Sequence, residues 1–285
     1  MNEEYTQKLS VLFLTTIREF KSGQLNLTID YYLNNLETKY KFDIFIFFDS
    51  FKTRRIRRFK RSLKKYEECS NVNKVILINN QIEDKQNIYI SNKQGFFDLN
   101  KFPLGRTHGI NYHFYTSMCK MFETDYENFL LLETDTKPLN KNWFDILVSE
   151  IDKTDFCIFG SKYKGVNREW VFSQYYGHHL NGVGVYKNNK ETSDLLYNSK
   201  HYIMNELQKD TKTNSKHENK THKEFMNYDV AIYLFAEANF LGHKLVNTKY
   251  FTNVSSVGNE LISVECVLKE FPETIIIHRK QLYDK

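Results

Sequence analysis

Cysteine and long apolar runs are scarce in this chain of 285 residues. Its four cysteines are Cys69, Cys119, Cys157 and Cys266. They lie far apart without a C-x-x-C pair, which argues against a zinc knuckle or a disulfide framework. The longest apolar stretches, Val11–Leu14 and Ile44–Phe48, fall far short of the roughly 20 residues that cross a bilayer. The acidic start, MNEEYTQK, lacks the basic region of a signal peptide, so we expect a soluble, cytoplasmic protein with reduced thiols.

Proline is also rare, and neither positive nor negative charge dominates. Only 3 prolines accompany abundant Asn, Lys, Ile and Tyr, a composition typical of an AT-rich genome. Such a genome suits a large DNA virus, a protist or a low-GC bacterium, and a viral protein would act in the host cytoplasm. The net charge of +5 is too slight for the pervasive basic surface of a dedicated nucleic-acid binder, although anionic ligands remain compatible with it.

The apolar residues that are present suffice for a substantial core, since they make up 41% of the chain. Three short apolar runs have the character of strands buried on both faces: Leu9–Ile17, Phe42–Asp49 and Val72–Gln81. Stripes at helical spacing separate them: Leu25, Ile29, Leu33, Leu36 and Tyr40, then Ile56, Phe59, Leu63 and Tyr66. This βαβαβ order predicts parallel strands, whose carboxyl ends bind ligands. The residues expected there are Thr15, Thr16, Arg18 and Asp49.

The alternation continues to the end of the chain. We predict a helix at Arg106–Phe122, a strand at Asn128–Glu133, a helix at Asn142–Ile151 and a strand at Asp155–Lys162. Residues 208–223 contain no apolar side chain and predict a mobile polar loop. Thr221 and Glu224 form a capping-box pattern that opens a helix at Phe225–Leu241, with Gly242 as its stop.

Two familiar nucleotide and hydrolase motifs are missing. The sequence contains no G-x-x-x-x-G-K-[ST] phosphate loop and no G-x-S-x-G nucleophile elbow. P-loop enzymes and serine hydrolases of that type are therefore disfavoured.

Two acids, Glu133 and Asp135, follow directly on the predicted strand Asn128–Glu133. Alternate side chains of an extended segment share a face, so both carboxylates can aim at one point on the sheet's carboxyl edge. Oxygen ligands of this kind suit Mn²⁺ or Mg²⁺, and such an ion neutralises the charge on a departing diphosphate. The alternative is that the two acids only begin a loop and cap the next helix.

The strand, the acid-x-acid triplet, a short turn with Pro138 and an aromatic-bearing helix resemble the D-x-D region of GT-A glycosyltransferases. Glu133 replaces the family's usual first Asp, which makes Asp135 the safer metal ligand. The resemblance implies a nucleotide diphosphate sugar as donor, bound with Mn²⁺ or Mg²⁺, and it extends donor contacts to Thr134. It also implies a glycan or glycoconjugate as the acceptor.

Three later segments match the order of the family's motifs. GHHLNGVGVY, Gly177–Tyr186, resembles its glycine-containing donor-sugar loop and assigns donor contacts to His179, Asn181 and Gly182. A plain turn or bulge before a strand at Val183–Tyr186 is the alternative. His278 ends the apolar run ETIIIH, and the resemblance implies a third metal ligand there, although a boundary histidine has the same pattern.

Asp229 interrupts the apolar segment FMNYDVAIYLFAEANF. An ionised side chain in such a helix is costly unless it is used or paired. The resemblance implies a general base that accepts the acceptor's proton if the reaction inverts configuration; a buried Asp held by backbone amides or an Arg is the alternative. Arg18 and Arg106 are assigned to the nucleotide's phosphates, and Asp49 to its base or ribose.

The basic run KTRRIRRFKRSLKK at 52–65 supports a competing interpretation, a binding module for nucleic acid or an anionic surface. Its spacing also fits an ordinary amphipathic helix with a solvated face, with peripheral contact to an anionic membrane as a further reading. A nucleotidyltransferase of similar fold is a second enzymatic alternative.

We predict a single α/β domain, GT-A-like (Rossmann-like), with a mostly parallel sheet, a donor-binding half at about 1–135 and an acceptor-binding half at about 136–285.

Overall fold

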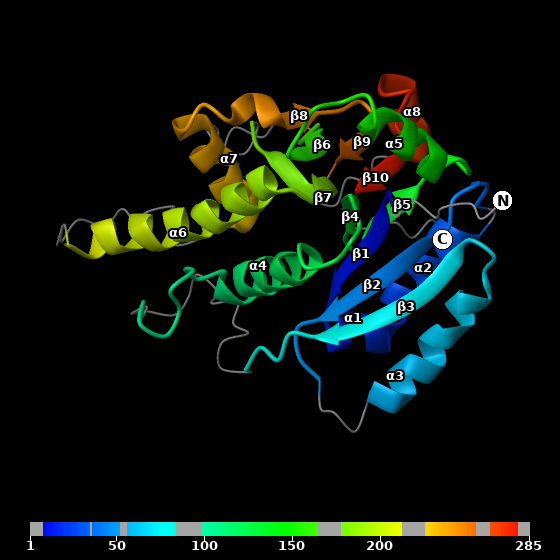
Figure 1. The fold of residues 1–285 in the computed structure, drawn as a ribbon, viewed down its shortest axis with the longest axis horizontal. Coiled ribbons are helices and arrows are strands. Elements are labelled where there is room, and N and C mark those ends of the chain that lie inside the picture. The colour runs from blue at the N-terminus through cyan, green and yellow to red at the C-terminus, as the bar shows by residue number, and fades with distance from the viewer. Residues whose placement is uncertain are drawn as a thin grey trace.

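The centre of the structure, a computed structural model, is a seven-stranded sheet in the order β3-β2-β1-β4-β7-β6-β8. The structure describes residues 8–34, 36–51, 56–83, 98–164, 178–212, 226–254 and 263–278. β1 (Ser10–Thr15), β2 (Phe42–Phe48), β3 (Val72–Asn79) and β4 (Asn128–Leu132) run parallel. β7 (Leu180–Lys187) is antiparallel to both β4 and β6 (Ile158–Lys162), and β8 (Leu245–Asn247) is parallel to β6. The mostly parallel α/β sheet predicted from the sequence is thus confirmed (Figure 1).

Helices cover both faces of this sheet, as its strands require. Val11 and Phe13 of β1 share one cluster with α2 (Gln24–Leu33), α3 (Ile56–Leu63) and α5 (Trp143–Ile151). Leu12, whose side chain points to the other face, joins the cluster that includes α4 (His108–Met121), α6 (Lys190–Lys212) and α7 (Tyr228–Ala238). Successive residues of one strand are therefore buried under different helices, which explains the continuous apolar runs.

A second, three-stranded sheet lies beside the end of β4 (Figure 1). Its order is β5 (Thr136–Pro138), β10 (Ile276–His278) and β9 (Phe251–Asn253). β10 pairs antiparallel with β5 and parallel with β9. This sheet brings the last described residues of the chain against the segment that follows β4.

The remaining short elements connect these layers. α1 (Ile17–Ser22) follows β1, the 3₁₀ turn η2 (Lys64–Glu68) extends α3, η4 (Gly242–Lys244) precedes β8, and α8 (Val264–Glu270) precedes β10. Among the described residues, no helix combines the length and the apolar character needed to span a membrane.

Several predicted boundaries are wrong. The first helical stripe was extended to Tyr40, but α2 ends at Leu33, because Asn34 adopts an extended conformation. The polar loop was begun at Gln208, but α6 continues to Lys212, and residues 213–225 lie outside the described part. The helix predicted at Phe225–Leu241 spans Tyr228–Ala238, with Asn227 at its N-cap. The proposed capping box of Thr221 and Glu224 also falls outside the described residues.

Candidate functional site

The two acids singled out in the sequence lie in a tight turn between β4 and β5. The backbone N–H and the hydroxyl of Thr136 both donate to the carbonyl of Glu133, at 3.2 and 2.7 Å. This closes the turn and leaves both carboxylates partly accessible, with 37% of the Glu133 side chain and 20% of the Asp135 side chain exposed. The turn therefore presents two carboxylates while its backbone is fixed.

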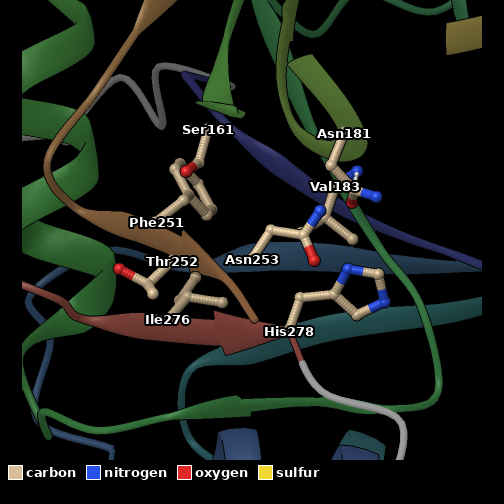
Figure 2. A pocket seen from close by; sticks show the side chains of 8 residues that line it. All are labelled: Ser161, Asn181, Val183, Phe251, Thr252, Asn253, Ile276 and His278. Carbon is tan, nitrogen blue, oxygen red and sulfur yellow. Dashed lines mark hydrogen bonds between the residues drawn. The ribbon is translucent and has the colours of Figure 1, made fainter. Parts of the chain in front are cut away.

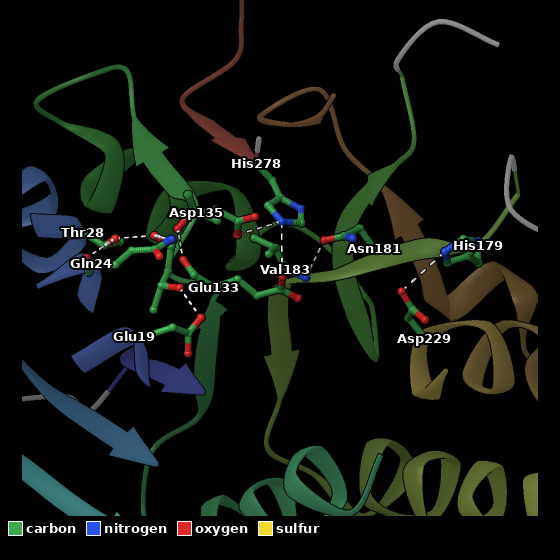
Figure 3. Close-up of polar contacts among 12 residues, drawn as sticks. Glu19, Gln24, Thr28, Glu133, Asp135, His179, Asn181, Val183, Asp229 and His278 are labelled. Atoms are coloured by element: carbon green, nitrogen blue, oxygen red, sulfur yellow. Dashed lines mark hydrogen bonds and ion pairs between the residues drawn. The ribbon is translucent and has the colours of Figure 1, made fainter. Parts of the chain in front are cut away.

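His278 reaches the same point from β10. It pairs with Thr136 across the antiparallel strands, which places its ring beside Asp135. Nε2 of His278 lies 3.2 Å from Oε2 of Glu133 and 3.1 Å from Oδ1 of Asp135 (Figure 3). One ligand atom from each residue lies within 4.8 Å of the others, an arrangement that can hold one metal ion.

The two carboxylates set the charge of this histidine. Burial lowers the pKa of His278, but the negative charges and hydrogen bonds of Glu133 and Asp135 outweigh it and raise the pKa to about 10. With no ion bound, His278 is therefore an imidazolium at neutral pH. Two oxygens and an imidazole nitrogen form a donor set that fits Mn²⁺, and Mg²⁺ is compatible with its oxygens.

The other ring nitrogen of His278 faces a small cavity lined by β7, β9 and β10 (Figure 2). Asn253, the register partner of His278 on β9, lines the same cavity. Nδ1 of His278 and Oδ1 of Asn253 are buried, and neither has a hydrogen-bond partner among the described residues. A metal-ligating histidine usually donates its second N–H to a carbonyl or to water, and no described residue supplies that partner for Nδ1 of His278.

Thr134, between the two acids, forms hydrogen bonds with residues of α1 and α2. Its hydroxyl donates to Oε1 of Glu19 at 2.6 Å. Its carbonyl accepts from the hydroxyl of Thr28 at 2.5 Å and from the amide of Gln24 at 3.3 Å. The side chain and the carbonyl of Thr134 are thus both directed toward α1 and α2.

A second acidic group lies at the start of α7. Oδ2 of Asp229 lies 3.5 Å from Nε2 of His179, and its Oδ1 accepts from the backbone N–H of Val230 at 2.9 Å. Both side chains are largely buried, with 15% of Asp229 and 8% of His179 exposed. Asp229 therefore lies in the first turn of the apolar helix and not at its middle, which removes much of the expected cost.

β7 connects the two acidic groups. Tyr186 donates to the carbonyl of Gly182 at 2.9 Å; burial first, then the charges of Asp229 and Glu133, raises the pKa of this tyrosine. Asn181 lines the cavity beside His278 and also a second small cavity beside Asp229. Its side-chain oxygen accepts from the backbone N–H of Val183 at 3.0 Å.

The glycines of the predicted donor loop are explained by protein packing. A Cβ at Gly182 would lie 1.9 Å from Oη of Tyr228, and one at Gly184 would lie 2.8 Å from the carbonyl of Phe159. The Tyr228 ring stacks on Phe114 at 3.7 Å and cannot retreat easily. The close approach that these glycines permit is therefore made by α7 and β6.

Three of the remaining predicted donor contacts lie at the ends of β1 and β2. Thr15 and Asp49 are buried neighbours, joined by a hydrogen bond of 3.2 Å from the Asp49 N–H to the Thr15 carbonyl. Thr16 caps α1, Arg18 is exposed on that helix, and Arg106 is buried just before α4. The structure brings Thr15, Thr16 and Asp49 to one edge of the sheet.

Sequence reasoning missed two residues that contact this site. Glu19 forms a capping box with Thr16, and the pattern T-x-x-E at Thr16 to Glu19 could have revealed it. Asn253 becomes a neighbour of His278 only through the pairing of β9 with β10, which no local pattern predicts.

Comparisons by sequence find no relative: no family model matches the chain, and no curated protein matches it. Solved structures do resemble it. The galactosyltransferase LgtC, in complex with donor and acceptor sugar analogues, superposes with a TM-score of 0.52 and 13% identity over 96% of this chain and 87% of that one. Mouse xyloside xylosyltransferase 1 superposes with a TM-score of 0.52 and 12% sequence identity, over 95% of this chain and 97% of that one.

The bifunctional glycosyltransferase WbbM gives a TM-score of 0.50 and 10% identity over 98% of this chain, which spans only 46% of WbbM. Identities this low establish the fold alone. These likenesses, together with the mixed sheet and its flanking helices, show that the chain has the GT-A fold.

Proposed function

We propose that the protein is a metal-dependent glycosyltransferase that moves a sugar from a nucleotide diphosphate sugar to a hydroxyl group of a glycan or glycoconjugate. The observation that carries this proposal is the convergence of Glu133, Asp135 and His278 at the end of β4 in a GT-A fold. LgtC and xyloside xylosyltransferase 1, which share the fold, are both named as sugar transferases.

Oδ1 of Asp135, Oε2 of Glu133 and Nε2 of His278 would hold Mn²⁺ or Mg²⁺. The bound ion would neutralise negative charge on the diphosphate as it leaves. Three protein ligands do not complete an octahedral shell, so positions remain for the donor's phosphate oxygens. Thr15, Thr16, Arg18, Asp49 and Arg106 are the proposed nucleotide contacts.

Asp229 is the carboxylate proposed to act on the acceptor. If the reaction inverts configuration, its carboxylate takes the proton of the acceptor hydroxyl as that oxygen bonds to the anomeric carbon and the sugar–phosphate bond breaks. His179 and the Val230 N–H hold this carboxylate in one orientation. If configuration is retained, Asp229 orients the acceptor or the sugar, with Asn181 and Gly182 as further sugar contacts.

The test is a thermal-shift panel of UDP-, GDP-, CDP- and dTDP-sugars, each with and without Mn²⁺, on the wild type and on Asp135→Asn. We expect Mn²⁺-dependent stabilisation by one nucleotide series, and its loss in the variant, because the substitution keeps the size of the ligand and removes its charge. Analysis of the products then separates two reactions. Release of a nucleoside diphosphate supports sugar transfer, whereas release of pyrophosphate indicates a nucleotidyltransferase.

A separate observation supports contact with an anionic bilayer. Five exposed basic residues, Arg57, Lys60, Arg61, Lys64 and Lys65, lie along α3 and η2. Lys65 pairs with Asp30 at 3.1 Å, and the other four make no ion pair with any described residue. The aromatic residues of the segment, Phe59 and Tyr66, are buried, which leaves no exposed ring for stacking on nucleic-acid bases.

The charge of this segment is local. Residues 52–65 contain nine Lys and Arg and no acid, which leaves 31 basic against 35 acidic residues elsewhere. Each basic residue near an anionic leaflet contributes about 1 kcal/mol. Co-sedimentation with phosphatidylserine vesicles should therefore exceed that with pure phosphatidylcholine and fall for Lys60→Glu/Arg61→Glu, but not for the control Lys153→Glu. Equal binding to both kinds of vesicle, or stronger binding to an oligonucleotide, would contradict the proposed contact with an anionic bilayer.

A further inference from the structure

Thr134 lies between the two acids of the turn. Among the described residues, its hydroxyl and its carbonyl form no hydrogen bond with Glu133, Asp135 or His278. Its hydroxyl and its carbonyl are instead both held by groups on α1 and α2. Thr134 is 5% exposed, and Thr28, which holds its carbonyl, is 3% exposed. The middle residue of the turn is therefore fixed at two atoms inside the protein while its neighbours face outward.

The group that holds the Thr134 hydroxyl is the carboxylate of Glu19. Oε1 accepts from Thr134, while Oε2 accepts from the N–H of Thr16 at 2.8 Å, its hydroxyl at 3.0 Å and the hydroxyl of Thr15 at 3.2 Å. In a capping box the carboxylate needs to accept only one bond, from the N-cap backbone N–H. The bond to Thr134 is additional to it and joins α1 to a turn more than 100 residues away.

We infer that Glu19 and Thr134 are positioning residues for the metal site. The Glu19 carboxylate fixes Thr134, which sets the backbone of the turn so that Glu133 and Asp135 both point at Nε2 of His278. The same carboxylate fixes Thr15 and Thr16, the proposed nucleotide contacts at the end of β1. The Glu19 side chain thus fixes the proposed nucleotide contacts, Thr15 and Thr16, relative to the turn that carries Glu133 and Asp135. This inference rests on the proposed function.

This arrangement predicts a defect in metal affinity that helix capping alone does not. Thr134→Val keeps the shape of the side chain, leaves the Thr16–Glu19 cap intact and removes the hydroxyl that Glu19 holds. Loss of such an outer partner typically weakens metal binding about 10-fold or more. Thr134→Ser restores the hydroxyl and should restore the affinity.

The experiment measures the dissociation constant of Mn²⁺ by calorimetry, without any substrate, together with the melting temperature of the metal-free protein. Wild type, Thr134→Val, Thr134→Ser and Ser199→Ala are compared. Ser199 is a matched control, because its buried hydroxyl contacts Tyr115 between α4 and α6, at 3.0 Å, away from the turn. We expect weaker Mn²⁺ binding in Thr134→Val alone.

A double-mutant cycle with Glu19→Ala tests the pairing directly. If the two side chains act as one unit, the double variant binds Mn²⁺ no more weakly than the worse single variant. Unchanged affinity in Thr134→Val, or equal losses in Thr134→Val and Thr134→Ser, would overturn the inference while leaving the metal site in place. A wild type that binds no Mn²⁺ would overturn the proposed function and this inference together.

Discussion

Metal binding should expel a proton from His278. In the ion-free protein this residue is an imidazolium with a pKa of about 10, held between carboxylates at 3.2 and 3.1 Å. An imidazole must be neutral to donate its lone pair to a metal. At pH 7, three units below that pKa, only about one molecule in a thousand has the neutral ring, which costs metal affinity about 4 kcal/mol.

Two consequences can be measured by titration calorimetry with Mn²⁺. The association constant should rise about 100-fold from pH 6.5 to pH 8.5, because each unit of pH raises the fraction of neutral His278 about tenfold. Repeating the titration at one pH in HEPES and in Tris, whose ionisation enthalpies differ, should show about one proton released per bound ion.

His278→Gln is the matched control, since it keeps a polar side chain and removes the titrating group. It should bind Mn²⁺ with an affinity that varies little with pH. A wild type that releases no proton, or an equally steep pH dependence in His278→Gln, would refute the reasoning and leave His278 as a structural partner of the two acids.

Three further predictions concern neighbouring residues. Asp229→Asn should lower transfer to the acceptor at least about 100-fold while calorimetric donor affinity stays nearly unchanged, and equal losses in both would indicate a structural role. Gly182→Ala should lower the free energy of unfolding in urea by about 1–3 kcal/mol, because its Cβ would lie 1.9 Å from Oη of Tyr228, and Tyr228→Phe in the same chain should recover part of the loss. Since the folded-state pKa of His278 is raised from 6.5 to about 10, metal-free protein should be most stabilised by this group below about pH 6.5 and lose that contribution as pH rises through 10; a flat stability profile over this range would contradict the ion pairs.

The strands could be predicted from sequence because helices cover both faces of the sheet. β1, β2 and β4 are continuous apolar runs for that reason, and their parallel order follows from the helices between them. The turn with Glu133 and Asp135 could be predicted because one such apolar run ends at Glu133. What a strand buries and where it ends are local properties, and both can be recognised in a single sequence.

Helix ends were harder to predict because apolar spacing indicates burial, and burial does not require a helix. Leu36 and Tyr40 continue the stripe of α2, yet they pack against the core from a segment that is no longer helical. The opposite error occurred in α6. Residues 208–223 have no apolar side chain, but the helix continues to Lys212 after an ion pair of 2.7 Å between Glu206 and Lys209, since a solvated turn of helix needs no apolar contact.

The partners of the candidate site residues could not be predicted, because they depend on strand pairing. Asn253 is the neighbour of His278 through the register of β9 with β10, and His179 contacts Asp229 because β7 begins beside the start of α7. Neither pair has a fixed separation in the sequence. The order of the motifs was sufficient to suggest a GT-A fold, whereas the contacts around each candidate site residue required the three-dimensional arrangement.

That arrangement gives β7 a role beyond its place in the sheet. The strand is antiparallel between β4 and β6, and its first residues extend from the cavity beside His278 to the cavity beside Asp229. Asn181 lines both cavities, and its side chain is fixed by the N–H of Val183. Gly182 and Gly184 have no side chain, which lets Tyr228 and β6 pack closely against the strand. A sugar held near the proposed ion and attacked from the side of Asp229 would therefore have to pass over a strand that α7 and β6 hold in place.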